Sequence, residues 1–116
     1  MGLVIETTDG NDTLTDMQTA IGQKESYGYE LLSLARGTAK GADANFAVFR
    51  DRRANDPLGP LMLKEIKGSL SREDQEGAIN DGEIEGAKLI SYGGLIVEKR
   101  KTNVAAYRQK PQPNPG

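Results

Sequence analysis

The stretch GYELLS at residues 28–33 has a counterpart, GAKLIS, at residues 86–91. Because 86 minus 28 is 58, the offset equals half the length of the 116-residue chain. A glycine followed by apolar residues is typical of a point where a helix ends and a strand begins, since glycine adopts positive φ at little cost. We therefore expect a helix–glycine–strand unit to occur twice.

The same offset aligns the whole chain without a gap. The identical pairs are Leu3 and Leu61, Gly10 and Gly68, Asp16 and Asp74, Ala20-Ile21 and Ala78-Ile79, Glu25 and Glu83, Gly28 and Gly86, Leu31 and Leu89, Ser33 and Ser91, Asn45 and Asn103, Ala47 and Ala105, and Arg50 and Arg108. These matches cluster where secondary-structure elements are expected. The pattern predicts an internal duplication of a β-α-β-β unit.

Each half contains the signals of these elements in the same order. LVIETT at residues 3–8 has strand composition, and the turn signal Asp9-Gly10 follows it. Two capping-box sequences, Thr13-x-x-Asp16 and Ser71-x-x-Asp74, predict helices over residues 14–26 and 72–84. Strands should follow each glycine, and turns are expected at residues 37–44 and 98–102. The last strands are predicted at residues 45–52 and 103–110.

The two predicted helices differ in quality. The first has an apolar stripe of Leu14, Met17, Ala20 and Ile21, with the stem of Lys24 beside it. The second has Arg72 and Gln75 at the positions of Leu14 and Met17, and it contains Gly77 and Gly82, each less favourable than Ala by roughly 1 kcal/mol. We expect the second helix to be looser or to cover a smaller core.

The predicted fold class is α+β, with mostly antiparallel sheet, helices on one face and pseudo-two-fold symmetry between the halves. Adjacent apolar residues, such as Leu31-Leu32 and Leu89-Ile90, give the strands two apolar faces. The face away from the helices therefore requires cover from the other half or from a partner chain. The alternative is one continuous sheet in a monomer. We predict a single domain over residues 1–110, built from repeats 1–52 and 61–110, a Pro/Gly linker at 53–60 and a disordered tail at 111–116.

The pattern between residues 20 and 50 resembles a small bacterial family, the domain of unknown function 4177. The matching residues are Ala20-Ile21-Gly22, Gly28-Tyr29-Glu30-Leu31-Leu32-Ser33 and Phe46-Ala47-Val48-Phe49-Arg50, with a weaker match in the second half at residues 86–91 and 104–108. Tyr29 and Ala87 replace an aromatic residue that is typical of the family. The resemblance implies a small α+β unit and no established activity, so it assigns no catalytic residue.

Composition restricts the chemistry. The chain has no His and no Cys, so it lacks the commonest general base, a thiol nucleophile and the main metal ligands. Carboxylates at Asp9, Asp12 and Asp16 are explained by turns and a helix cap. No catalytic residue, metal or cofactor is predicted. The formal net charge is −2, the chain carries no signal-peptide pattern and no long apolar run, and a cytoplasmic location without membrane contact is expected.

These observations favour a non-enzymatic binding or assembly module that forms homo-oligomers or binds a protein partner. The alternative is a small-ligand-binding protein or small enzyme with its site between the repeats, where paired polar residues would converge: Asn45 and Asn103, Ser33 and Ser91, and Arg50 and Arg108. A single-stranded nucleic-acid binder is less favoured. It would use basic residues at two equivalent strand ends and at one tip, but the chain is acidic overall. These residues are Arg50, Arg52 and Arg53, then Arg108 and Lys110, and Lys99-Arg100-Lys101 at the tip.

Overall fold

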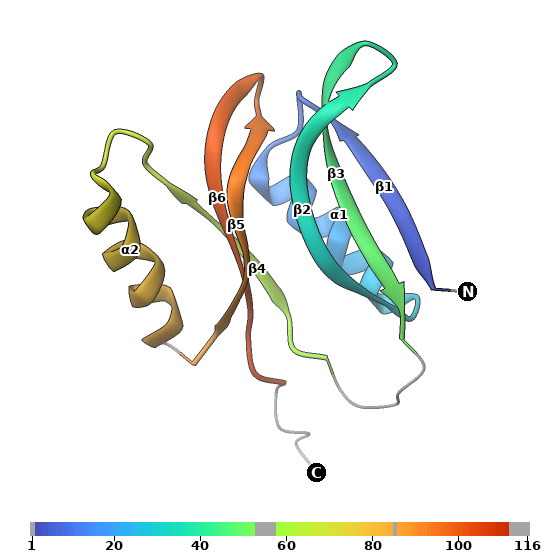
Figure 1. Cartoon of the computed structure of the whole chain (residues 1–116). Coiled ribbons are helices and arrows are strands. Elements are labelled where there is room, and N and C mark those ends of the chain that lie inside the picture. Colours follow the sequence, from blue (N-terminus) through green and yellow to red (C-terminus); the bar gives the residue numbers. More distant parts are fainter. Residues whose placement is uncertain (1, 53–57, 85, 112–116) are drawn as a thin grey trace.

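The computed structural model describes residues 2–52, 58–84 and 86–111, and its elements follow the order β-α-β-β twice (Figure 1). The elements are β1 (Leu3–Asp9), α1 (Leu14–Ser26), β2 (Tyr29–Ala39), β3 (Ala42–Asp51), β4 (Leu61–Ile66), α2 (Arg72–Ile84), β5 (Lys88–Val97) and β6 (Arg100–Arg108). They form two antiparallel three-stranded sheets, ordered β1-β3-β2 and β4-β6-β5. The predicted α+β class and duplicated unit are confirmed. Below, β1–β3 with α1 form the first half, β4–β6 with α2 form the second, and residues 58 positions apart are called equivalent.

Local signals place the helix boundaries where the sequence predicts them. Thr13 Oγ1 accepts a hydrogen bond from the Asp16 backbone N–H at 3.1 Å, and Asp16 Oδ2 accepts one from Thr13 N–H at 3.3 Å. The Ser71 hydroxyl accepts the bond from Asp74 N–H at 3.1 Å. Gly28 and Gly86 have φ of 96° and 91°, so both helices end at the glycine that the opening motif indicates.

The hairpins are longer than the sequence predicts. Residues 37–44 and 98–102 were expected to form turns, but β2 continues to Ala39 and β6 begins at Arg100. Two-residue turns replace the expected loops, with φ of 53° at Lys40 and 80° at Gly41 in the first hairpin. Positive φ at both central residues matches the twist of paired strands, so pairing extends to the turn. Both register shifts also fall at equivalent positions, Leu31/Ser33 and Leu89/Ser91.

Each helix covers one face of its own sheet. In the first half, Met17 and Ile21 of α1 pack with Leu31 and Phe49, and all four side chains are at most 4% exposed. Ala20 was predicted in this stripe but is exposed, and it lines a surface pocket with Ala47 and Phe49 at the margin of the packed face. In the second half, α2 covers a separate cluster around Tyr107. That cluster has fewer buried members, as the sequence predicts.

The halves contact each other through different surfaces. Leu61 and Leu63 of β4 lie on the face of the second sheet opposite α2, and they are 6% and 8% exposed because α1 and the first sheet cover them. The equivalent residues Leu3 and Ile5 of β1 are each 63% exposed. A two-fold axis would bury both pairs alike. The predicted pseudo-two-fold relation is therefore not confirmed, and the halves are arranged head to tail.

In Figure 1, α2 lies on one side of the second sheet and the first half lies on the other side. Most of the predicted linker (residues 53–57) and tail (residues 112–116) lie outside the described residues. Among the described residues, no helix is long and apolar enough to span a membrane.

Two glycines of α2 provide a matched test of its packing. An ideal Cβ on Gly82 would lie 2.5 Å from the hydroxyl oxygen of buried Tyr107, whereas one on Gly77 would meet no atom within 4 Å. Both Gly→Ala substitutions gain about 1 kcal/mol of helix propensity, but overpacking typically costs about 1–3 kcal/mol. We expect the unfolding free energy of Gly82→Ala to fall about 1–3 kcal/mol below that of Gly77→Ala in urea titrations. Equal values would contradict this packing of α2.

Candidate functional site

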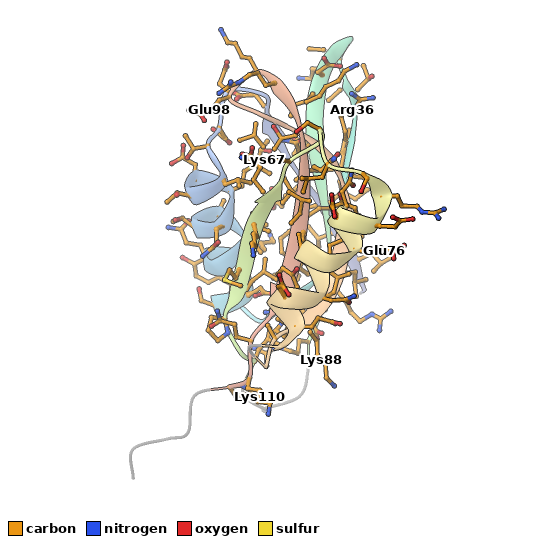
Figure 2. All side chains as sticks on the ribbon, turned by 90° about the vertical axis from the view of Figure 1, so that its left-hand side faces the viewer. Arg36, Lys67, Glu76, Lys88, Glu98 and Lys110 are labelled. Atoms are coloured by element: carbon orange, nitrogen blue, oxygen red, sulfur yellow. The ribbon has the colours of Figure 1, made fainter. Side chains whose placement is uncertain are left out.

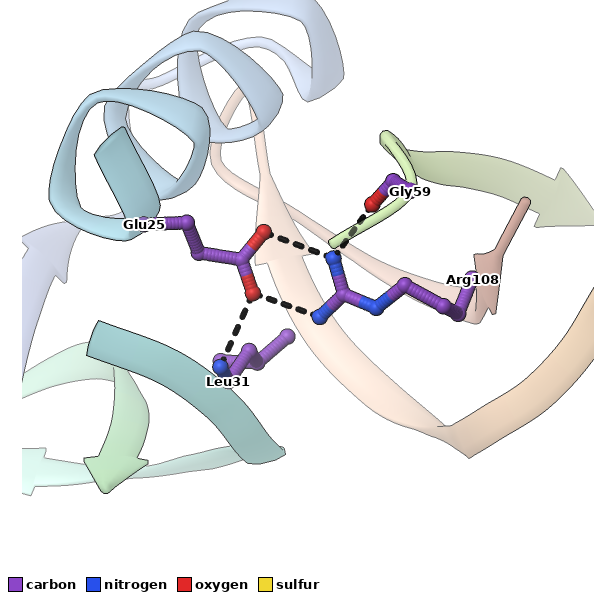
Figure 3. Close-up of polar contacts among 4 residues, drawn as sticks. All are labelled: Glu25, Leu31, Gly59 and Arg108. Atoms are coloured by element: carbon purple, nitrogen blue, oxygen red, sulfur yellow. Dashed lines mark hydrogen bonds and ion pairs between the residues drawn. The ribbon is translucent and has the colours of Figure 1, made fainter. Parts of the chain in front are cut away.

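The contact between the halves contains a buried ion pair (Figure 3). Arg108 of β6 donates to both carboxylate oxygens of Glu25 at the end of α1, at 2.7 and 2.5 Å, and it also donates to the Gly59 carbonyl at 2.8 Å. The same carboxylate accepts the Leu31 backbone N–H at 2.9 Å. The two side chains are only 14% and 9% exposed. One carboxylate therefore joins α1, β2 and β6.

A second polar contact joins the hairpins. Asn45 of β3 is 2% exposed, and its amide nitrogen donates to the Ile96 carbonyl at 2.7 Å while its oxygen accepts Ile96 N–H at 2.8 Å. The Asn45 amide thus pairs with one residue of β5 as a neighbouring strand would. The β5–β6 turn contacts the β1–α1 loop. Lys99 N–H donates to the Gly10 carbonyl at 2.6 Å, and Glu98 N–H donates to the Asp12 carbonyl at 3.1 Å.

Asn103, which is equivalent to Asn45, lies in a different environment. It lines an open cavity of about 630 Å³ between β5, the β4–α2 turn and the edge of β2. Within residues 2–52, 58–84 and 86–111 its side chain has no hydrogen-bond partner. The cavity also includes Arg36, Glu65, Gly68, Tyr92 and Gly94. Of the predicted site residues, Asn103 lines this open cavity.

The other predicted site residues do not meet in one cleft. Asn45 and Arg108 are occupied by contacts between the halves, and Arg50 is exposed on β3. Ser33 and Ser91 lie at the register shifts of β2 and β5. Their role in binding a ligand stays a prediction.

Two surfaces of the candidate site were missed at the level of sequence. From the sequence, Glu25 was assigned no partner, whereas its pairing with Arg108 buries it. Leu3 and Ile5 were assigned to a strand without being placed on a free face. The offset of 58 identifies the equivalent of each residue, but no signal in the sequence shows which member of a pair is buried.

Two titratable groups in the described part of the chain have shifted pKa values. Burial raises the pKa of the Asp12 carboxyl above its usual value, and the neighbouring carboxylates of Asp9 and Asp16 raise it further. Burial also raises the pKa of Tyr107, with Glu83 and Asp81 adding to the effect, and its hydroxyl donates to the Ile79 carbonyl at 2.8 Å. No group of three carboxylates in the described part of the chain is placed to hold a metal ion. These groups are accounted for by turns, caps and packing.

Comparison with known proteins found no matching family model, curated protein or solved structure. The resemblance to the domain of unknown function 4177 therefore depends only on the short motifs around Gly28 and Phe46.

Arg108 and its equivalent Arg50 provide a matched test of the ion pair. Removing one partner of a buried pair leaves an uncompensated charge and costs about 3–5 kcal/mol, so Arg108→Ala should lower the unfolding free energy by about that amount. Arg50→Ala removes an exposed side chain and should change it by less than about 0.5 kcal/mol. Chemical denaturation of both variants at low protein concentration measures the difference. Similar losses in both would argue against a buried Glu25–Arg108 contact.

The two asparagines allow the same comparison for the hairpin contact. Asn45→Ala leaves the N–H and carbonyl of Ile96 without their partner, at about 1–3 kcal/mol for each buried group. Asn103→Ala removes no such bond and should change stability little. Hydrogen exchange of the Ile96 amide gives a local readout. Its protection should fall in Asn45→Ala and stay unchanged in Asn103→Ala, and unchanged protection in both would contradict the assignment.

Proposed function

We propose that this protein is a non-enzymatic assembly module that associates with further copies of itself through the outer face of its first sheet. The observation that supports the proposal is the contrast between equivalent residues. Leu61 and Leu63 are buried by the other half, whereas Leu3 and Ile5 are each 63% exposed. The outer face of the first sheet is thus exposed, although the equivalent face of the second sheet is buried within the same chain.

The exposed face extends across the sheet. The pairings of Ile5 with Val48 and Thr7 with Phe46 place the partly exposed Val48 and Phe46 beside Leu3 and Ile5 on the same side. Contiguous apolar surface on a folded protein marks an interaction site. Its removal from water contributes about 25 cal/mol per Å². A second copy is the proposed occupant because the chain already contains a surface that binds the equivalent face.

The cavity at Asn103 supports one alternative, a small-ligand-binding protein. Its volume of about 630 Å³ is comparable with known ligand sites, and it lies between the repeats. Native mass spectrometry separates the two functions because it reports chain number and retained mass together. A bound small molecule on a monomer would favour the alternative.

Ile5→Lys tests the proposal directly. A charge on the outer face would be desolvated on association, so we expect this variant to be monomeric at concentrations where the unsubstituted protein is not. Sedimentation velocity over a concentration series measures the change. Gln23→Lys, on the exposed side of α1, adds the same charge elsewhere and should leave association unchanged. A monomeric unmodified protein at every concentration would refute the proposed function.

A further inference from the structure

Each half has two surfaces, its helix-bearing side and the opposite side of its sheet, which gives four in the chain. The contact between the halves uses only two of them. In the first half it uses the helix-bearing side, with Asn45, Glu25 and the β1–α1 loop. In the second half it uses the opposite side and the β5–β6 turn. The unused surfaces are the outer face of the first sheet and the helix-bearing side of the second. By the offset of 58, these are the equivalents of the two surfaces that already bind each other.

The helix-bearing side of the second half retains the features of a receiving surface. Asn103 is equivalent to Asn45, and Gly68 is equivalent to Gly10, whose carbonyl accepts the Lys99 N–H. Both lie at the open cavity, and a Cβ on Gly68 would be 3.5 Å from the Asn103 amide nitrogen. In the first half, β5 covers the part of the sheet around Asn45. In the second half, the equivalent part around Asn103 is open.

The β2–β3 hairpin has the shape of the segment that covers this part of the sheet in the first half. Its turn residues Lys40 and Gly41 have φ of 53° and 80°, and the equivalent Glu98 and Lys99 have 49° and 64°. The two hairpins therefore share one turn geometry. Thr38 is equivalent to Ile96, and it is exposed on β2, which is an edge strand of the first sheet. Figure 1 shows both hairpins extending to the same end of the molecule.

The residues equivalent to the Glu25–Arg108 ion pair are also present. Glu83 accepts the Leu89 backbone N–H at 3.1 Å, as Glu25 accepts that of Leu31. Glu83 and Arg50, the equivalents of Glu25 and Arg108, are both exposed. Glu76, which projects from α2 in Figure 2, is equivalent to Gln18, whose side-chain oxygen accepts Leu63 N–H at 2.9 Å. A carboxylate also accepts hydrogen bonds, so Glu76 has the chemistry to accept the N–H of Ile5, the equivalent of Leu63, from another copy.

We propose that copies of this chain assemble head to tail by repeating the contact that joins their own halves. This inference depends on the self-association proposed above and specifies its mode. The outer face of the first sheet of one copy covers the helix-bearing side of the second half of the next. Thr38 pairs with Asn103, and Arg50 pairs with Glu83. Such a heterologous contact uses two different surfaces, so it continues into a filament or closes into a ring.

Mixing two blocked variants tests this mode. Ile5→Lys disables the outer face, and Asn103→Lys disables the receiving surface of the full chain. Each variant alone should be monomeric by native mass spectrometry and sedimentation velocity. The equimolar mixture should form a species of two chains and nothing larger, because one intact surface of each kind remains. The unmodified protein should form species of more than two chains or a closed ring.

The outcomes separate this inference from the proposed function. If the unmodified protein associates but Asn103→Lys associates equally well, the contact is made by two outer faces and the head-to-tail mode is wrong. A mixture that stays monomeric overturns it also. If the unmodified protein is monomeric throughout, the proposed function itself fails. A retained small molecule on monomers that is lost in Asn103→Lys assigns the cavity to a ligand and overturns the inference.

A charge exchange provides a second test that does not depend on the folding of Asn103→Lys. Arg50→Glu and Glu83→Arg both change exposed side chains. Each should weaken assembly alone, because like charges then meet at the contact. Their equimolar mixture should restore the larger species, since every contact between unlike variants again pairs opposite charges. Failure of the mixture to recover, with both variants folded by circular dichroism, would contradict the Arg50–Glu83 pairing.

Discussion

Each three-stranded sheet has two apolar faces, but each half supplies only one helix to cover them. This constraint determines how the halves are arranged. The second sheet is covered on one face by α2 and on the other by α1 and the first sheet, so Leu61, Leu63 and Ala106 are all buried. The first sheet is covered on one face only. Two identical units in a head-to-tail contact always leave one surface of each kind uncovered, and the exposed Leu3 and Ile5 follow from that geometry.

The sequence predicted the elements well because their signals are local. The capping pairs and the positive-φ glycines act over a few residues, and they place the ends of α1 and α2 where they are observed. The duplicated order could also be predicted, since the offset of 58 needs no knowledge of packing. The hairpin turns were predicted too long because Lys40, Glu98 and Lys99 adopt positive φ although they are not glycines. That conformation is uncommon for such residues and is not readable from composition.

The relation between the halves was less predictable. Several equivalent residues are of the same type but have different surroundings, and sequence alone reports only the type. Asn45 and Asn103, or Arg108 and Arg50, are indistinguishable by type, while one member of each pair is engaged across the interface and the other faces solvent or a cavity. A two-fold arrangement and a head-to-tail arrangement satisfy the same apolar pattern. The choice between them depends on the shape of the packed surfaces.

The polar contacts between the halves define their register. An apolar face can slide against another at little cost, because dispersion and hydrophobic burial are not directional. The Asn45 amide can pair only with a residue whose backbone N–H and carbonyl both face it. The Glu25 carboxylate must bind Arg108 while it accepts the Leu31 N–H. A displacement of one residue would leave buried polar groups unpaired, which costs more than the apolar contact gains. The same residue types at Asn103, Glu83 and Arg50 give the unused surfaces the means to select one register as well.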